Sequence, residues 1–153
     1  MQTAKKGFTL IEVIIVLAIA ALIMVVVFNS VGGAQKSQRD SQRRTDLGYL
    51  VSQLEQYAGN NNGDYPDPGD LSNFTANYID NNDKSFRDPV AGEHYVLEEN
   101  TTLESQESPS GLCGGGEDLT ESGYQPVYYN RLSRRSFVVE ICLESGNYVQ
   151  TNK

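Results

Sequence analysis

The feature that most constrains this chain is an apolar run near its N-terminus, residues 8–28, with the sequence FTLIEVIIVLAIAALIMVVVF. Its polar side chains are Thr9 and Glu12. As an α-helix these 21 residues span about 31 Å, the thickness of a hydrocarbon core. Lys5 and Lys6 precede the run, so the positive-inside rule places the N-terminus in the cytoplasm. The run predicts a membrane-spanning helix with a carboxylate near one end.

The presence of Glu12 helps to decide between possible functions of this apolar run. A secretory signal peptide would be cut after a small-x-small triplet such as Ala18-Ile19-Ala20. However, the apolar run continues to Phe28, so that cut would leave an apolar new terminus. A plain membrane anchor explains the length of the run but not Glu12, because a carboxylate in a membrane-spanning helix costs up to about 3 kcal/mol and usually has a functional partner.

The residues KGFTLIEV, Lys6 to Val13, with the apolar run that follows them, resemble the prepilin motif of type IV pilins and type II secretion pseudopilins. The resemblance implies that a membrane peptidase cuts the chain after Gly7 and methylates the new amine of Phe8. It also implies that Glu12 lies near the N-terminal amine of a neighbouring subunit during assembly. A carboxylate beside an ammonium group is far less costly in a low dielectric than a carboxylate alone.

The same resemblance implies a structural subunit, not an enzyme. The expected partners are further copies of the chain in a helical homopolymer, the prepilin peptidase, the membrane and an assembly platform in the inner membrane. The precursor would lie in the inner or cytoplasmic membrane and the assembled product in an extracellular pilus. The alternatives are a major pseudopilin in a periplasmic pseudopilus and a minor subunit at a filament tip. A rival of another class is a membrane-anchored binding domain that is neither cut nor polymerised.

The resemblance and the residue pattern together predict an α+β, pilin-like fold, with one long N-terminal helix packed on an antiparallel sheet. Leu47, Leu50 and Leu54 follow the spacing of one apolar helix face. Residues 35–46, QKSQRDSQRRTD, are polar all round, which predicts a helix that has left the membrane and has not yet met its head. The expected segments are a leader at 1–7, a hydrophobic helix at 8–33, an amphipathic helix half at 34–58 and a globular head at 59–153.

The C-terminal part has the pattern of antiparallel strands. Strand-like runs occupy residues 124–130, 135–144 and 147–151, and RLSR at 131–134 and ESGN at 144–147 are the expected turns. In the middle run, Phe137, Val139 and Ile141 alternate onto one face. That face is expected to pack on the leucine stripe of the helix.

Charge is distributed unevenly along the chain. The chain has twelve basic and twenty acidic residues, and six of the basic but two of the acidic residues lie in the first 44 positions. The remaining segment therefore carries six basic and eighteen acidic side chains. Such a domain repels nucleic-acid phosphates at long range, so direct nucleic-acid binding is not expected.

Few other residues indicate a disulfide, a catalytic role or a metal site. Cys113 and Cys142 form an even pair in a domain that the N-terminus marks for export, which favours one disulfide. The single histidine, His94, has the pattern of a surface or half-buried residue and not of a catalytic base, so no catalytic residue is assigned. No cofactor is expected. Calcium is the one metal considered, and its weak candidate ligands are the hard oxygens of Asp80, Asp83 and Asp88.

Overall fold

The computed structural model describes residues 7–80, 86–104, 113 and 126–152, and within the helix the side chains of residues 29–31 are excepted. The chain divides into two compact units, Met1–Lys36 and Ser37–Lys153. We call the second of these the head unit. Each unit is described by itself.

The helix α1 runs from Leu10 to Asn60, 51 residues, which confirms the predicted long N-terminal helix. From Leu47 onward its leucines are fully buried. The helix ends where Asn62 and Gly63 have positive φ angles of 58° and 86°, a conformation that glycine and asparagine tolerate best. The amide of Gly63 donates a hydrogen bond of 2.8 Å to the carbonyl of Ala58, which satisfies one of the last carbonyls of the helix.

Short helical turns follow the long helix. They are the 3₁₀ turn η1 (Pro68–Asp70), the α-helical turn α2 (Leu71–Phe74) and the π-helical turn η2 (Thr75–Asp80). The ring of Phe74 meets that of Tyr57 edge to face, with centroids 5.7 Å apart. These turns therefore cover the last part of α1 with aromatic side chains.

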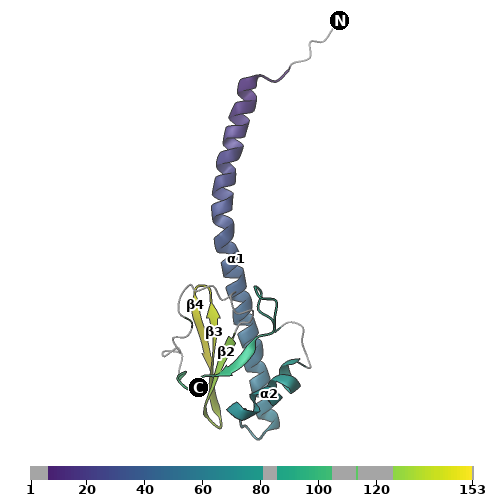
Figure 1. The fold of residues 1–153 in the computed structure, drawn as a ribbon, viewed down its shortest axis with the longest axis vertical. Helices are drawn as coiled ribbons and strands as arrows, with labels where there is room; N and C mark the ends of the chain where they lie inside the picture. The colour runs from purple at the N-terminus through teal and green to yellow at the C-terminus, as the bar shows by residue number, and fades with distance from the viewer. Residues whose placement is uncertain (1–6, 81–85, 105–112, 114–125, 153) are drawn as a thin grey trace. The chain divides into compact units, whose positions relative to one another are not determined.

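The head unit contains a four-stranded sheet in the order β1-β2-β3-β4, shown beside α1 in Figure 1. The strands are β1 (Val96–Glu99), β2 (Pro126–Ser133), β3 (Ser136–Leu143) and β4 (Gly146–Thr151). The pairs β2–β3 and β3–β4 are antiparallel, whereas β1 pairs with β2 in parallel. The fold is α+β and pilin-like, as predicted, with a sheet that is mostly but not wholly antiparallel.

The two faces of β3 pack against different partners. Phe137, Val139 and Ile141 belong to the main core together with the leucines of α1, so the predicted packing of that face is confirmed. Val138 lies on the opposite face, in a second cluster with Leu103 and Val149. Every residue of β3 after Ser136 is buried, so this strand is covered on both sides.

One predicted turn is wrong. Residues 131–133 were expected to lie in a turn, but β2 continues to Ser133, and the ladder to β3 shifts register between Arg131 and Ser133. Arg131 stays in the strand because its guanidinium is engaged: Nη1 donates to the carbonyl of Tyr65 at 3.0 Å and lies 2.5 Å from Oδ1 of Asp67.

Candidate functional site

The start of α1 is organised by Thr9 and Glu12. The Glu12 carboxylate oxygen Oε2 accepts a hydrogen bond of 2.8 Å from the Thr9 amide and one of 2.7 Å from the Thr9 hydroxyl. The Glu12 amide in turn donates to the Thr9 hydroxyl at 3.4 Å. This is the reciprocal arrangement of a capping box, which satisfies amide groups that the first helical turn leaves without partners.

The capping box gives Glu12 a partner within its own chain. Sequence reasoning expected its partner to be the amine of a neighbouring subunit, and that contact between subunits stays a prediction. The Thr-Leu-Ile-Glu spacing is itself a capping-box pattern, so the contact with Thr9 could have been predicted from the sequence.

Gly7 and Phe8, the residues on either side of the expected cleavage, lie before the helix begins. Phe8 is 91% exposed. A Cβ atom placed on Gly7 would meet no other atom within 4 Å. The Gly7–Phe8 bond is therefore outside helical structure.

The apolar part of α1 is exposed along its length. Its large apolar side chains, from Leu10 to Phe28, are between 49% and 91% exposed when Phe8 is included. Within the described residues, α1 is the helix that is long and apolar enough to cross a membrane. Exposed apolar surface on this scale marks a membrane or a protein interface.

Buried charges lie where the helix enters the head unit. The guanidinium nitrogen Nε of Arg43 donates to Oδ2 of Asp88 at 2.7 Å, and both side chains are 2% exposed. Nη1 of Arg43 lies 3.9 Å from Oδ1 of Asp40 and has no hydrogen-bond partner. The prediction that the polar residues 35–46 have not yet met the head is therefore wrong from Asp40 onward: Asp40, Arg43 and Asp46 are all buried, whereas residues 35–38 are exposed.

Asp40 joins the helix to the turn between β3 and β4. Its two carboxylate oxygens accept the backbone amides of Glu144, at 2.8 Å, and Ser145, at 3.1 Å. Arg39 binds the Glu144 side chain with two nitrogens, and its Nη2 lies 2.8 Å from Oε2. Partial burial raises the pKa of Asp40, but these amide hydrogen bonds and the charge of Arg43 outweigh it, so the pKa lies below its ordinary value.

Asp46 and Asp88 join the helix to the segment before β1. The Tyr95 hydroxyl donates to Oδ2 of Asp46 at 2.9 Å. Burial, with the nearby Asp46 carboxylate, raises the pKa of Tyr95 far above its usual range. Burial also raises the pKa of Asp88, but the hydrogen bond from Arg43 and those from the amides of residues 90 and 91 outweigh it, so the pKa is lowered.

Comparison with known protein families matches residues 2–28 to the prokaryotic N-terminal methylation motif. The chain carries the prepilin-type motif. This is the motif of type IV pilins and pseudopilins, and it supports a precursor of one of these two kinds. Searches of curated proteins and of solved structures give no match.

The prepilin-type motif accounts for the architecture of the first unit. It implies processing by a prepilin peptidase and assembly into a filament, and with the exposed apolar helix it fits a membrane-anchored precursor. The family that this motif defines is one of structural subunits.

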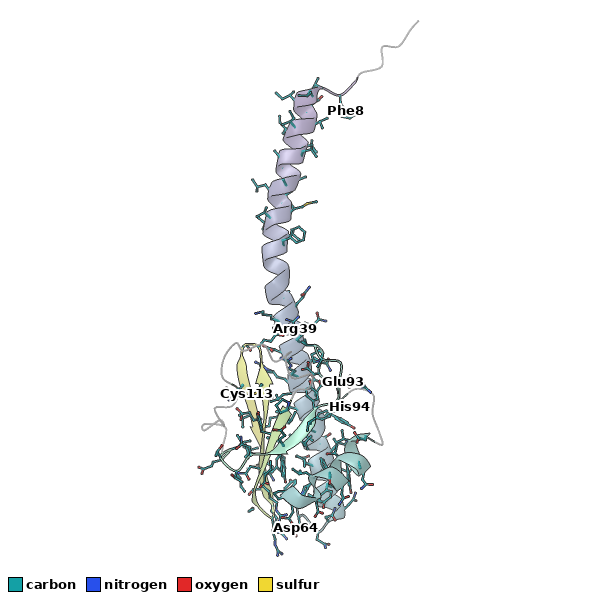
Figure 2. All side chains as sticks on the ribbon, in the orientation of Figure 1. Phe8, Arg39, Asp64, Glu93, His94 and Cys113 are labelled. Atoms are coloured by element: carbon teal, nitrogen blue, oxygen red, sulfur yellow. A yellow bond between two sulfur atoms is a disulfide. The ribbon has the colours of Figure 1, made fainter. Side chains whose placement is uncertain are left out.

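The disulfide expected of such a precursor is present. Cys113 is bonded to Cys142 across a sequence separation of 29 residues. Cys142 lies on β3, on the face opposite the main core, so the bond holds Cys113 at that face. Figure 2 shows Cys113 on the side of the head unit away from Glu93 and His94.

The candidate calcium ligands do not come together within the described residues. Asp88 is buried against Arg43, and Asp80 is exposed at the end of η2. Asp83 lies outside the described residues. Among the residues that the structure places, no three acidic, histidine or cysteine side chains are grouped to hold a metal. No cofactor was expected from the sequence, and the described residues do not test the weak calcium candidates. His94 is half-buried, as expected.

Proposed function

We propose that the chain is the structural subunit of a type IV pilus-like filament, cut after Gly7, methylated on Phe8 and assembled through its N-terminal helix. The observation that carries the proposal is the presence of one carboxylate, Glu12, in the otherwise apolar first part of α1, whose large apolar side chains are at least 49% exposed. A helix that only anchors a domain gains nothing from that carboxylate, because it raises the cost of insertion.

The geometry supports a two-stage role for Glu12. In the precursor, its carboxylate is occupied by the amide and hydroxyl of Thr9. Cleavage after Gly7 creates an ammonium group on Phe8, one residue before Thr9. When subunits pack together, the ammonium of one copy and the Glu12 carboxylate of another form an ion pair in a low dielectric, which sets the axial register between the copies.

The Cys113–Cys142 disulfide suits a subunit exported to an oxidising compartment, whether the periplasm or the cell exterior. We favour a pilus on the tyrosine-rich strands at the C-terminus, which carry Tyr128, Tyr129 and Tyr148. The alternative is a major pseudopilin. It draws support from NGDYP, Asn62 to Pro66, and from RDPVAGEHYVL, Arg87 to Leu97, which are similar to stretches of pseudopilins and related pilins.

The processing step can be tested at Gly7. Because a Cβ at this position meets no other atom within 4 Å, a Gly7→Leu substitution leaves the fold of the chain undisturbed and acts on recognition by the peptidase. We expect Gly7→Leu to retain the leader in membranes, whereas the matched leader substitution Gln2→Leu is cut normally. Normal cutting of Gly7→Leu, measured as the intact mass of the protein, contradicts the proposed processing site.

Assembly is tested separately at Glu12. We expect Glu12→Ala to be cut and methylated but to give few filaments, because the register contact between subunits is lost. An unchanged filament yield from this variant contradicts the proposed role of the carboxylate.

A further inference from the structure

The end of α1 carries the one Asn-Gly pair in the sequence, Asn62-Gly63. Asparagine before glycine deamidates readily, because glycine has no side chain to shield its amide nitrogen. Hydroxide removes the Gly63 amide proton, the nitrogen attacks Cγ of Asn62 to form a five-membered succinimide, and Nδ2 leaves as ammonia with a proton from water. A second water molecule then opens the ring at either carbonyl, which gives aspartate or isoaspartate at position 62.

The backbone of the folded head holds Asn62 in a conformation that cannot close the succinimide ring. Its φ of 58° lies in the left-handed region, where ψ is about +30° to +60°. With that ψ, the Gly63 nitrogen lies nearly opposite Cβ of Asn62 across the Cα–C bond, whereas ring closure requires the two atoms on the same side. Asn62 is exposed, so its protection comes from this backbone conformation and not from burial.

Hydrogen bonds at the helix end oppose the rotation that ring closure needs. The Gly63 amide donates to the carbonyl of Ala58 at 2.8 Å. Turning over the peptide plane between Asn62 and Gly63 breaks this bond, which closes the C-terminus of the helix. The amide of Asp64 donates to the carbonyl of Asn61 at 3.0 Å and must move as well. The reaction therefore has to wait until the helix end opens.

The segment after this cap is fixed to the sheet at two points. The amide of Tyr65 donates to the carbonyl of Arg134 at 2.9 Å. The hydroxyl of Tyr129, a fully buried residue of β2, donates to the carbonyl of Pro66 at 2.9 Å. Both bonds join the chain that follows the helix to the sheet, so they favour the closed state of the helix end.

Deamidation works against closing the helix end again. A carboxylate at position 62 adds negative charge at the negative end of the helix dipole, and α1 has no basic residue in its last turn. Asp64 lies two residues further on, at the end of the head unit where α1 stops (Figure 2). In isoaspartate the main chain is also longer by one methylene, which displaces the amide that bonds to Ala58.

We propose that Asn62 is a site of spontaneous deamidation, which the native fold suppresses and which reacts when the end of α1 opens. Because the product disfavours the closed cap, the reaction marks chains whose heads have been open and leaves folded heads unmodified. The inference goes beyond the proposed function and does not depend on assembly of a filament.

The site is tested by the rate at which Asn62 is converted in the full-length, detergent-solubilised chain at mildly alkaline pH. Peptide mass reports deamidation at position 62, and a protein-isoaspartate methyltransferase with labelled S-adenosylmethionine reports isoaspartate. We expect conversion to be about tenfold or more slower in the native chain than in urea that unfolds the head, because opening must precede the reaction. Equal rates, or an Asn62 that stays intact in urea, would overturn the proposal.

Two tyrosine variants distinguish the local cap from general stability. Tyr129→Phe removes the hydroxyl bound to Pro66 and should raise the native rate about threefold or more, since loss of one hydrogen bond makes opening easier. Tyr128→Phe removes a hydroxyl from the neighbouring residue of β2, which packs on the opposite face of the sheet, and should leave the rate unchanged. An unchanged rate in Tyr129→Phe, or an equal increase in both variants, would contradict protection by the cap.

Discussion

Arg43 and Asp88 form a buried ion pair, with Nε of Arg43 2.7 Å from Oδ2 of Asp88 and each side chain 2% exposed. The two residues are 45 positions apart in the chain. The pair connects α1 to the turn that precedes β1, so it couples the helix to the head. Because a buried charge without its partner is costly, this contact should respond strongly to the loss of one side.

Replacing Arg43 should therefore destabilise the head unit. We expect Arg43→Met to reduce the free energy of unfolding by about 3 kcal/mol, because it leaves the Asp88 carboxylate buried without its cation. Thermal unfolding of the detergent-solubilised chain, followed by circular dichroism, measures the loss. The control is Arg44→Met: Arg44 is exposed and lies over the ring of Tyr148, 5.4 Å from its centroid, so its loss should have a much smaller effect. Equal effects of the two substitutions would show that burial of Arg43 contributes nothing.

Lowering the pH should reduce the stability of the same region of the head unit. The pKa values of Asp40 and Asp88 are lowered from 3.8, and the Arg39 guanidinium, through its hydrogen bonds, lowers the pKa of Glu144 from 4.5. A carboxylate whose pKa is lowered in the folded state gives its full stabilisation when the pH is above its unfolded-state pKa. It loses this contribution as the pH falls through its folded-state pKa. We expect the melting temperature to be level near neutral pH and to fall below about pH 4.

Asp88→Asn provides the matched variant for the acid effect. Its melting temperature should be lower at neutral pH and should depend less on pH in the acidic range, because one of the titrating groups has been removed. An equally steep acid dependence in this variant would mean that Asp88 does not contribute to the effect.

The capping box predicts a specific difference between two substitutions of Thr9. Thr9→Val keeps the shape of the side chain but removes the hydroxyl that contacts Glu12, whereas Thr9→Ser keeps the hydroxyl. Amide hydrogen exchange in detergent micelles should show faster exchange in the first turn of α1 in Thr9→Val and wild-type exchange in Thr9→Ser. Faster exchange in both variants would indicate that the methyl group, and not the hydroxyl, matters.

Loss of the disulfide should destabilise the head without abolishing its fold. Closure of the loop between Cys113 and Cys142, whose sequence separation is 29 residues, contributes about 3–4 kcal/mol in the chain-entropy model. The Cys113→Ala/Cys142→Ala double variant should lose stability by this amount in denaturant unfolding and keep the circular dichroism spectrum of the native sheet. A spectrum of an unfolded chain would mean that the helix–sheet core alone is insufficient.

Much of the fold could be predicted because it follows from local periodicity. The leucines at 47, 50 and 54 repeat with helical spacing, and Phe137, Val139 and Ile141 alternate as in a strand. Both sets are in the main core. The parallel pairing of β1 with β2 could not be predicted in this way, because the partner of a short edge strand depends on contacts far apart in the sequence.

The buried charges were missed for a related reason. Asp40, Arg43 and Asp46 are spaced three residues apart, which places them on one helix face, but polar residues give no apolar signal of burial. Their burial depends on Asp88, Tyr95 and the amides of the β3–β4 turn. Of the candidate site, Gly7 was expected to precede the helix, as it does, but Phe8 was expected to begin a helix that in fact begins at Leu10. The partner of Glu12 within its own chain was overlooked.

The most direct test of the central claim is the mass of the N-terminal peptide of this protein in a fraction sheared from the cell surface. The account predicts a peptide that begins at N-methylated Phe8 and is recovered from that fraction. The same peptide found only in membranes would contradict a surface pilus and favour the pseudopilin. A peptide that still carries Met1 to Gly7 would contradict processing altogether and leave a membrane-anchored domain.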